Sequence, residues 1–445
     1  MKKLIITIPT LIFTVLAAGG QDVGKRIDSL IEKAVKLNRF NGSVLVSKNG
    51  KIVYEKSDGY QNVNKHILNT SNTIYQIGST TKEFTAAVIL KLAEQHKLSL
   101  EDKLSKYFPD YKRGDEITVK HLLTHTSGIS EILRDHTAVN ESAIPRSIEK
   151  TLSYFINKPL DFDPGTRYSY SNSGYILLGL IIEKVTGQTY QLAVREFILK
   201  PLKMNHTGFD FAGLRSSYKA MGYTKYTQLI HEESIPWDST ATFSAGSLYS
   251  TVKDLYKWHQ GLLNYKVYSK ASLQEATTPF LEGYGLGCWI DTLYTKKIVS
   301  HGGNILGFTG YFGRIQEDDV CVILLNNIYN HQIETIGLSI FAILYNKPYS
   351  YFDEIKLSAE LLEKYAGEYE VNADYKVKII RTGDQLFIQR NNKPEIEIFA
   401  YKENGFFQKD DDIRISFQME NNIITQITIR EGLNTKKGDK IKLKQ

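Results

Sequence analysis

The sequence Thr73-Ile-Tyr-Gln-Ile-Gly-Ser-Thr-Thr-Lys82 changes character within ten residues. Its first part is a short run of β-branched and aromatic residues that ends at Gly78, which permits a tight turn. Beyond it, apolar residues recur at helical spacing, at Phe84, Ala87, Val88 and Leu92. The stretch therefore predicts an extended segment that turns into an amphipathic helix at Ser79.

Ser79 and Lys82 lie three positions apart, so on a helix both side chains project into one site. A serine hydroxyl becomes a good nucleophile only when a base takes its proton, and a lysine can do this only if its pKa is lowered. The same spacing recurs at Ser147/Lys150, Ser216/Lys219 and Ser250/Lys253. Those three pairs lie in polar segments or at a helix entry, and we interpret them as surface residues. The pair at Ser79 predicts covalent catalysis, with its backbone N–H at a helix N-terminus suited to an oxyanion.

Residues 21–346 carry strand-like runs at both ends and helical periodicity in the middle. The strand-like runs are residues 42–54, 283–290, 297–300, 310–315 and 320–325. This order predicts an α+β domain whose antiparallel sheet is assembled from both ends of the segment.

A second domain is predicted for residues 355–445, after an interruption at residues 346–352. A helix-like segment at residues 359–365 comes first. Short alternating runs follow, broken by glycine and asparagine, as in consecutive hairpins. They predict a small all-β barrel or sandwich.

Residues 1–20 have the features of a signal peptide. Lys2 and Lys3 precede an apolar run from Leu4 to Ala18, and small residues follow. The run is short for a membrane span. We expect cleavage, no stable transmembrane anchor, and a periplasmic or extracellular location; an uncleaved anchor is the alternative.

The net charge of +6 is concentrated at the two ends of the chain. Lys2 and Lys3 belong to the signal segment, and residues 435–445 are rich in lysine. The body is close to neutral, so nucleic acid is not expected as a partner. No metal or nucleotide motif occurs in the sequence, and no cofactor or metal is expected. Cys288 and Cys321 fit either a disulfide or two buried thiols.

Two further elements follow Ser79 in chain order. Tyr170-Ser-Asn172 immediately precedes a helix that starts near Gly174, and His301-Gly-Gly303 leaves a strand. Taken singly, each has an ordinary interpretation: a packed tyrosine, an asparagine that caps a helix, or a polar residue at a strand end. Their order along the chain is what makes them informative.

Five longer strings carry a family resemblance. They are Gln76-Ile-Gly-Ser-Thr-Thr-Lys-Glu-Phe-Thr-Ala86, Ile117-Thr-Val-Lys-His-Leu-Leu-Thr-His-Thr-Ser-Gly128, Pro164-Gly-Thr-Arg-Tyr-Ser-Tyr-Ser-Asn-Ser-Gly-Tyr175, Gly283-Tyr-Gly-Leu-Gly287 and His301-Gly-Gly303. In these strings the chain resembles the penicillin-recognising serine hydrolases, in particular the group similar to class C β-lactamases, D-alanyl-D-alanine carboxypeptidases and related esterases. The resemblance covers residues 28–327, and the C-terminal segment resembles a lipocalin-like β domain.

The resemblance implies a role for each site residue. Ser79 would form an acyl-enzyme, and Lys82 and Tyr170 would share the general base and acid duty, with the choice of base left open. Asn172 would hold Lys82 and the substrate amide. The strand after His301, which includes Gly303, would present its backbone to the substrate. The N–H groups of Ser79 and Asn304 would form an oxyanion hole.

One departure from the family pattern bears on the substrate. Many lactamases and carboxypeptidases have Lys-Thr-Gly where this chain has His301, Gly302 and Gly303. Histidine is mostly neutral at pH 7 and glycine has no hydroxyl, so a substrate carboxylate should be bound more weakly. The sequence predicts a secreted hydrolase of amide or ester bonds in β-lactams, D-amino-acid peptides or esters. The alternative is a catalytically weak penicillin-binding or sensing protein.

Overall fold

The computed structural model describes residues 12–330, 332–349, 351, 353–391, 393–409, 413–431 and 434–441. Most of the predicted signal segment, residues 1–11, lies outside these ranges. Residues 12–20 are the first part of helix α1 (Ile12–Lys36). Across the described ranges, we find no helix that is both long and apolar enough to cross a bilayer.

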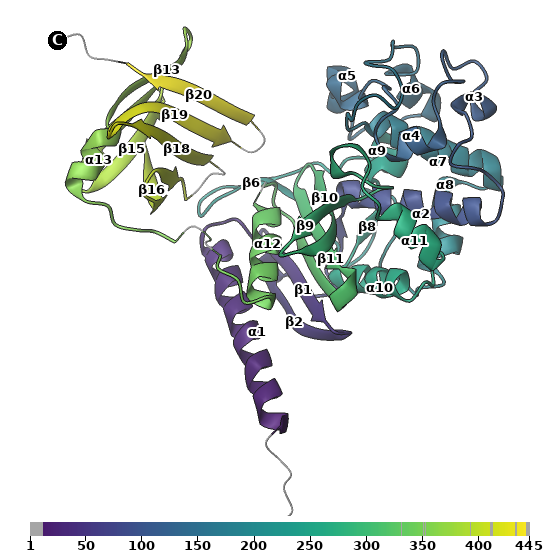
Figure 1. Cartoon of the computed structure of the whole chain (residues 1–445), viewed down its shortest axis with the longest axis horizontal. Coiled ribbons are helices and arrows are strands. Elements are labelled where there is room, and N and C mark those ends of the chain that lie inside the picture. Colours follow the sequence, from purple (N-terminus) through teal and green to yellow (C-terminus); the bar gives the residue numbers. More distant parts are fainter. Residues whose placement is uncertain are drawn as a thin grey trace, which may run out of the picture.

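A six-stranded antiparallel sheet forms the centre of the larger part of the molecule (Figure 1). Its order is β2-β1-β12-β11-β10-β9. The strands are β1 (Gly42–Lys48), β2 (Lys51–Asp58), β9 (Trp289–Leu293), β10 (Lys296–Ile305), β11 (Phe308–Ile315) and β12 (Val320–Asn326). Because β1 pairs with β12, strands from the two ends of the segment are neighbours. The predicted α+β architecture is therefore confirmed.

Helices cover both faces of this sheet. Strand residues Val44 and Leu324 pack with α1 and α12 (Ile333–Leu344) in one apolar cluster. Their neighbours Leu45 and Ile323 point to the opposite face, as side chains alternate along a strand. With both faces covered, every residue of β11 and β12 is buried.

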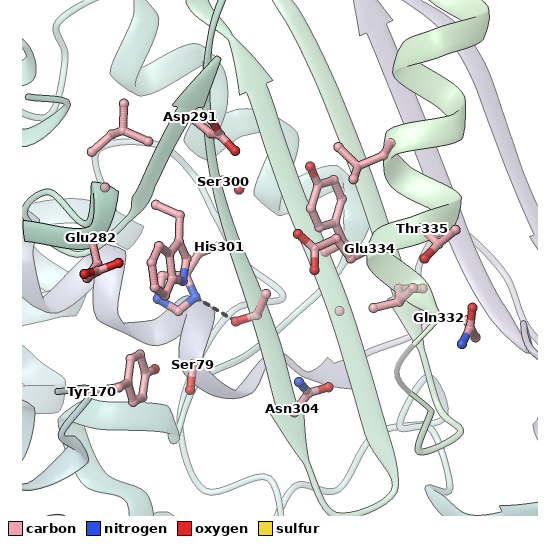
Figure 2. Close-up of a pocket in the computed structure, with 18 of the residues that line it drawn as sticks. Ser79, Tyr170, Glu282, Asp291, Ser300, His301, Asn304, Gln332, Glu334 and Thr335 are labelled. Atoms are coloured by element: carbon pink, nitrogen blue, oxygen red, sulfur yellow. Dashed lines mark hydrogen bonds between the residues drawn. The ribbon is translucent and has the colours of Figure 1, made fainter. Parts of the chain in front are cut away.

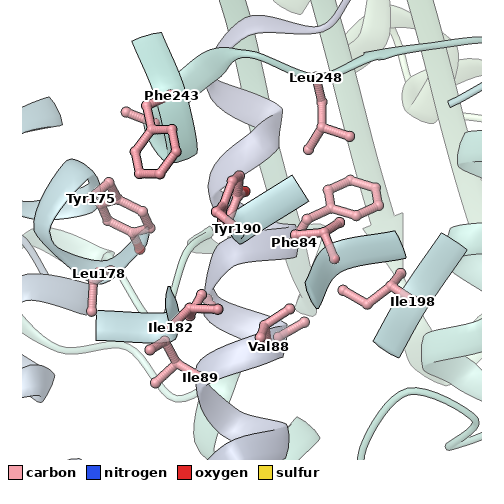
Figure 3. Close-up of a cluster of buried hydrophobic side chains, with 14 of the residues drawn as sticks. Phe84, Val88, Ile89, Tyr175, Leu178, Ile182, Tyr190, Ile198, Phe243 and Leu248 are labelled. Carbon is pink, nitrogen blue, oxygen red and sulfur yellow. The ribbon is translucent and has the colours of Figure 1, made fainter. Parts of the chain in front are cut away.

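The second face packs on a helical region built around α2 (Thr81–Glu94). In Figure 3, Phe84 and Val88 of α2 meet Tyr190 and other apolar side chains of this cluster. The surrounding helices are α3 (Leu104–Tyr107), α4 (Val119–Leu123), α5 (His136–Asn140), α6 (Ile148–Ser153), α7 (Asn172–Thr186), α8 (Tyr190–Val194), α9 (Ser239–Gly246), α10 (Val252–Leu263) and α11 (Lys270–Ala276). Small two-stranded pairs join β3 (Tyr60–Asn62) to β4 (Ile67–Leu68), β5 (Tyr75–Gln76) to β8 (Tyr249–Ser250), and β6 (Tyr223–Tyr226) to β7 (His231–Glu233).

The strand predicted at residues 283–290 begins only at Trp289, so most of that prediction is wrong. Leu281–Gly283 is a 3₁₀ turn, and the residues after it pack on α2 as a loop. Gly287 shows why: it has φ +86°, and a Cβ there would lie 2.9 Å from the Lys82 carbonyl oxygen. The close approach to α2 replaces strand pairing in this segment.

The C-terminal part is a closed eight-stranded antiparallel barrel, preceded by α13 (Ala359–Tyr365). Its strands are β13 (Gly367–Asn372), β14 (Tyr375–Thr382), β15 (Gln385–Arg390), β16 (Ile396–Lys402), β17 (Gly405–Phe407), β18 (Ile413–Glu420), β19 (Ile423–Glu431) and β20 (Asn434–Lys440). Buried and more exposed residues alternate in β18, as the sequence pattern predicted. The barrel prediction is confirmed.

Cys288 and Cys321 are both buried free thiols. Cys321 belongs to the apolar cluster between the sheet and the helical region, whereas Cys288 packs with Ile290 and Val299. Of the two alternatives left open by the sequence, the structure supports the buried thiols.

Candidate active site

Ser79 lies in the turn that joins a short strand to α2. Gly78, at φ +50°, begins a 3₁₀ turn (Gly78–Thr80) that continues directly into the helix. The turn puts Ser79 at the N-terminal end of α2, where backbone N–H groups lack helical partners. The predicted change from extended segment to helix at this residue is present in the structure.

Lys82 is fully buried beside Ser79. Its Nζ donates hydrogen bonds of 2.7 Å to Asn172 Oδ1 and 2.7 Å to the Ala245 carbonyl oxygen, and lies 3.2 Å from Ser79 Oγ. Burial lowers the pKa of Lys82 to about 7, against a smaller opposing effect of the Glu131 carboxylate. A substantial fraction of this amine is therefore neutral at neutral pH and can accept a proton.

Asn172 is held in one orientation by Glu131. Its Nδ2 donates to Glu131 Oε1 at 2.8 Å, and its backbone N–H donates to Glu131 Oε2. With the amide nitrogen committed, Oδ1 faces Lys82. Sequence reasoning missed Glu131 and the Ala245 carbonyl, because neither has a spacing that connects it to Lys82.

Tyr170 lies next to the lysine, with its ring centre 4.8 Å from Lys82 Nζ. The buried His125 also packs against Tyr170, with 4.2 Å between the two ring centres. Loss of solvent raises the pKa of Tyr170, and a hydrogen bond from Ser79 opposes this rise only in part. The phenol is therefore protonated at neutral pH.

His301, Gly303 and Asn304 belong to β10, which passes Ser79 at close range. A Cβ on Gly303 would lie 1.9 Å from the Ile77 carbonyl oxygen, so only glycine fits there. A Cβ on Gly78 would lie 3.1 Å from the Asn304 backbone nitrogen. The contact brings the backbone of Asn304 next to the turn that carries Ser79.

His301 is buried, and both of its ring nitrogens have partners. Nδ1 donates to the Gly302 carbonyl oxygen at 2.7 Å, so Nε2 accepts from the Tyr284 hydroxyl at 3.0 Å. Burial and the charge of Lys82 lower the pKa of His301 to about 3. His301 is therefore neutral. Tyr284, its partner, belongs to one of the five strings that carry the resemblance, but the sequence assigned it no role.

A cavity of about 1100 Å³ opens beside Ser79. Tyr170, Asn172, His301 and Asn304 all line it with Ser79, whereas Gly303 faces away toward Ile77. Figure 2 shows Ser79 and Tyr170 at one side of β10, and Glu334 and Thr335 at the other. Among the residues that the structure describes, no cluster of three potential metal ligands occurs. The arrangement suits a nucleophile activated by a neutral amine.

Comparison with known proteins identifies both parts of the chain. The family model described as "Beta-lactamase" matches residues 27–334, and the model described as "Domain of unknown function (DUF3471)" matches residues 353–443. The putative penicillin-binding protein PbpX of Bacillus subtilis is 33% identical over 66% of this chain and 72% of its own length. Protein flp of Staphylococcus aureus is 31% identical over 70% of this chain, and the match spans 64% of flp.

The resemblance to a solved structure extends over nearly the whole chain. The octameric penicillin-binding protein homologue from Pyrococcus abyssi is 28% identical, with a TM-score of 0.69. The match covers 94% of this chain and 100% of that protein. The combination of the α+β part and the barrel is thus present in another protein.

Proposed function

The chain belongs to the beta-lactamase family of serine hydrolases, and from this premise we propose that it hydrolyses amide or ester bonds through an acyl-enzyme on Ser79. The observation that carries the proposal is the position of Lys82. Its buried amine lies 3.2 Å from Ser79 Oγ with a pKa lowered to about 7. A base of this pKa is well matched to catalysis near neutral pH.

In the acylation step, Ser79 Oγ bonds to the substrate acyl carbon and gives its proton to Lys82 Nζ. Asn172 and the Ala245 carbonyl oxygen keep the amine aimed at Ser79. The negative charge on the substrate oxygen is stabilised by the backbone N–H groups of Ser79 and Asn304, each worth about 2.7–4 kcal/mol in such sites. Collapse of this intermediate breaks the bond to the leaving group, which takes a proton as it departs.

Tyr170 is the proton relay in this mechanism. Its raised pKa keeps the phenol protonated, so Lys82 is the base and Tyr170 passes a proton toward the leaving group. Water then attacks the acyl-enzyme carbon and loses a proton along the same route in reverse. The products are a free acid and the regenerated serine.

The proposed substrates are β-lactams, D-amino-acid peptides or esters, with weak binding of a carboxylate next to the reacting bond. Neutral His301 supports this, because it offers no positive charge where relatives have a lysine. The same observation favours esters and peptide amides over efficient β-lactam turnover.

We also propose the location and the domain limits. The chain is exported and residues 1–20 are cleaved off in the process, and its two domains are residues 21–346 and 355–445. N-terminal sequencing of protein recovered from cell fractions tests the first statement. Limited proteolysis tests the second, with cutting expected between residues 346 and 355.

The hydrolase proposal is tested with a fluorophosphonate label and with p-nitrophenyl acetate and nitrocefin as substrates. We expect labelling and turnover in the wild type and neither in Ser79→Ala. Ser216→Ala is the matched control, since Ser216 has the same spacing to a lysine but is a half-buried residue whose Oγ accepts from the Tyr218 backbone N–H. Labelling that survives in Ser79→Ala contradicts the site assignment. A stable adduct without turnover supports the weak penicillin-binding or sensing protein instead.

A further inference from the structure

His125 is a buried residue that holds the chain on both sides of Tyr170. Its backbone carbonyl oxygen accepts a hydrogen bond of 2.9 Å from the Ser169 N–H. Its ring Nδ1 accepts one of 3.1 Å from the Ser171 N–H. Tyr170 therefore lies between two backbone groups that are bonded to the same residue, and its ring packs on the ring of that residue.

The hydrogen bond from Ser171 decides which nitrogen of the His125 ring carries the proton. Burial and the charge of Lys82 lower the pKa of His125 well below its usual range, so the ring is neutral. Because Nδ1 accepts, the proton is on Nε2. In the part of the chain that the structure describes, this buried nitrogen has no hydrogen-bond partner.

Packing alone does not account for a histidine at this position. A buried N–H without an acceptor costs free energy, and a phenylalanine would fill the same space without that cost. What a phenylalanine lacks is the acceptor at Nδ1. The role of the His125 ring therefore lies in the bond to Ser171, next to Tyr170.

The loop that begins at His125 fixes the whole segment around Tyr170. His125 has φ +57°, a conformation that histidine, asparagine and aspartate adopt more readily than other non-glycine residues. Three side chains of residues 171–173 are bonded to the following residues of the loop: Ser171 to Ile129, Asn172 to Glu131 and Ser173 to Ser130. Within this loop, His125 is the residue that contacts Tyr170 itself.

The position of Tyr170 matters most when the leaving group departs. In the proposed mechanism, Tyr170 gives its hydroxyl proton to the leaving atom as the bond to the acyl carbon breaks, and it takes a proton from the Lys82 ammonium in return. A proton donor must lie within about 2.6–3.2 Å of the atom that it protonates. A misplacement of about 1 Å can cost about 10²-fold in rate.

We propose that His125 is the positioning residue for Tyr170: its carbonyl oxygen, its Nδ1 and its ring face together hold the phenol where it can protonate the leaving group. The inference rests on the proposed hydrolysis at Ser79. His125 is not one of the described residues that line the cavity of Ser79, so it acts through Tyr170.

The test compares p-nitrophenyl acetate with p-nitrobenzyl acetate, which differ by one methylene group. Both esters give the same acetyl-enzyme on Ser79, so a difference between them in kcat/KM arises in acylation. p-Nitrophenoxide departs near neutral pH without a proton, whereas the p-nitrobenzyl alkoxide needs one. The ratio of kcat/KM for the two esters therefore measures how well the leaving group is protonated.

The full-length variants are His125→Ala, His125→Asn and the control His121→Ala. His121 is a half-buried histidine of the same segment whose Nδ1 also accepts from a backbone N–H, that of Thr118. We expect His125→Ala to lower kcat/KM for p-nitrobenzyl acetate about 10- to 100-fold, and that for p-nitrophenyl acetate by a much smaller factor. The control should leave the ratio unchanged.

His125→Asn should recover part of the loss. The asparagine amide oxygen can accept from the Ser171 N–H, and asparagine tolerates the positive φ, but the ring that packs on Tyr170 is absent. Thermal unfolding followed by circular dichroism checks that each variant is folded. If His125→Ala does not fold, His125→Asn carries the comparison, with the same selective loss on p-nitrobenzyl acetate at a smaller size.

A double-mutant cycle with Tyr170→Phe separates positioning from a general structural role. Tyr170→Phe removes the proton donor and should lower kcat/KM for p-nitrobenzyl acetate about 10²-fold or more. In this background, His125→Ala should add little, because two residues that act through one group are not additive. Equal losses on the two esters in the His125 variants, or a loss that adds in full to that of Tyr170→Phe, overturns the proposal.

The same measurements separate this proposal from the hydrolase proposal. If the wild type cleaves neither ester and is not labelled at Ser79, hydrolysis is wrong and the role of His125 falls with it. If the wild type cleaves both esters and the His125 variants keep the wild-type ratio, hydrolysis stands and only the positioning role is wrong.

Discussion

The α+β part and the barrel differ in what they bury. The α+β part encloses Lys82, Glu83, Arg314 and His301, all almost inaccessible to solvent. The barrel core is apolar and aromatic, and among its described residues the buried polar side chain is Gln408. Burial of a charge costs free energy unless partners compensate for it. Burial of these groups therefore costs the α+β part stability that their partners must offset, whereas the apolar barrel core contributes stability.

The partners of the buried charges show how the cost is offset. Glu83 and Arg314 form a buried ion pair of 2.6 Å, and Trp258 Nε1 donates to the same carboxylate at 3.0 Å. Among the described residues, the hydrogen-bond partners of the Lys82 amine include no carboxylate. Burial instead lowers the pKa of the amine to about 7, so that a substantial fraction of it is neutral at neutral pH, as the proposed chemistry needs.

The largest expected effect is on activity, from Lys82→Met. Removal of a general base should lower the acylation rate about 10²- to 10⁴-fold. The barrel should be unaffected, because the hydrogen-bond partners of Lys82 all belong to the α+β part. Stopped-flow acylation with p-nitrophenyl acetate measures the loss. An undiminished rate contradicts the assignment of Lys82 as the base.

Glu83→Ala should produce the largest loss of stability. The substitution leaves the buried Arg314 without its carboxylate, and broken buried pairs of this kind cost about 3–5 kcal/mol. Urea unfolding followed by tryptophan emission measures it, since Trp237, Trp258 and Trp289 all lie in the α+β part. The exposed Glu101→Ala is the control. If Glu83→Ala loses no more stability than Glu101→Ala, buried charge is not what distinguishes the α+β part from the barrel.

Ile427→Ala tests the apolar core of the barrel in the same comparison. Ile427 is fully buried in the barrel core, and such a truncation costs about 2–5 kcal/mol. Far-UV circular dichroism should show the barrel unfolding at a lower urea concentration than in the wild type. The tryptophan transition of the α+β part and the turnover of p-nitrophenyl acetate should stay unchanged. A tryptophan transition that shifts with the barrel step means that the two parts unfold as one unit.

The pH dependence follows from the lowered pKa of Lys82, about 7 in the folded protein against 10.5 for an unperturbed lysine. Acylation should rise about tenfold between pH 6 and pH 8 and then level off, because the base must be neutral. Between pH 7 and 10.5 the unfolded chain holds a proton that the folded chain has lost. The free energy of unfolding should therefore increase with pH in this window. Lys82→Met should abolish this pH-dependent contribution to the free energy of unfolding. A wild-type pH–rate profile for acylation without a step near pH 7 contradicts the assignment of Lys82 as the base.

Glu131→Gln should have the smallest effect. The Glu131 carboxylate raises the pKa of Lys82 and holds the amide of Asn172. With a neutral glutamine, the midpoint of the pH–rate profile should move below that of the wild type, and the rate should fall only severalfold. A structural role alone would lower the rate without moving the midpoint.

Local features were predictable because chain neighbours encode them. The turn at Gly78, the helix that follows Ser79 and the alternation in β18 all follow from residues a few positions apart. The ordered strings around Ser79, Tyr170 and His301 also predict five residues that the structure places along one cavity. The strand prediction for residues 284–288 is wrong, because the packing of this loop on α2 depends on residues about 200 positions away.

The chain's own pattern specified the α+β and barrel architectures, the serine and the lysine beside it. The tertiary structure decided what these groups can do. It buries Lys82 and brings its hydrogen-bond partners Asn172 and Ala245, which are 90 and 163 positions away in the sequence, next to the amine. It also keeps His301 neutral by burying it. It also places barrel arginines in the cavity of Ser79. Protonation and charge at a site depend on solvent and on atoms brought together by packing, and neither is visible in local spacing.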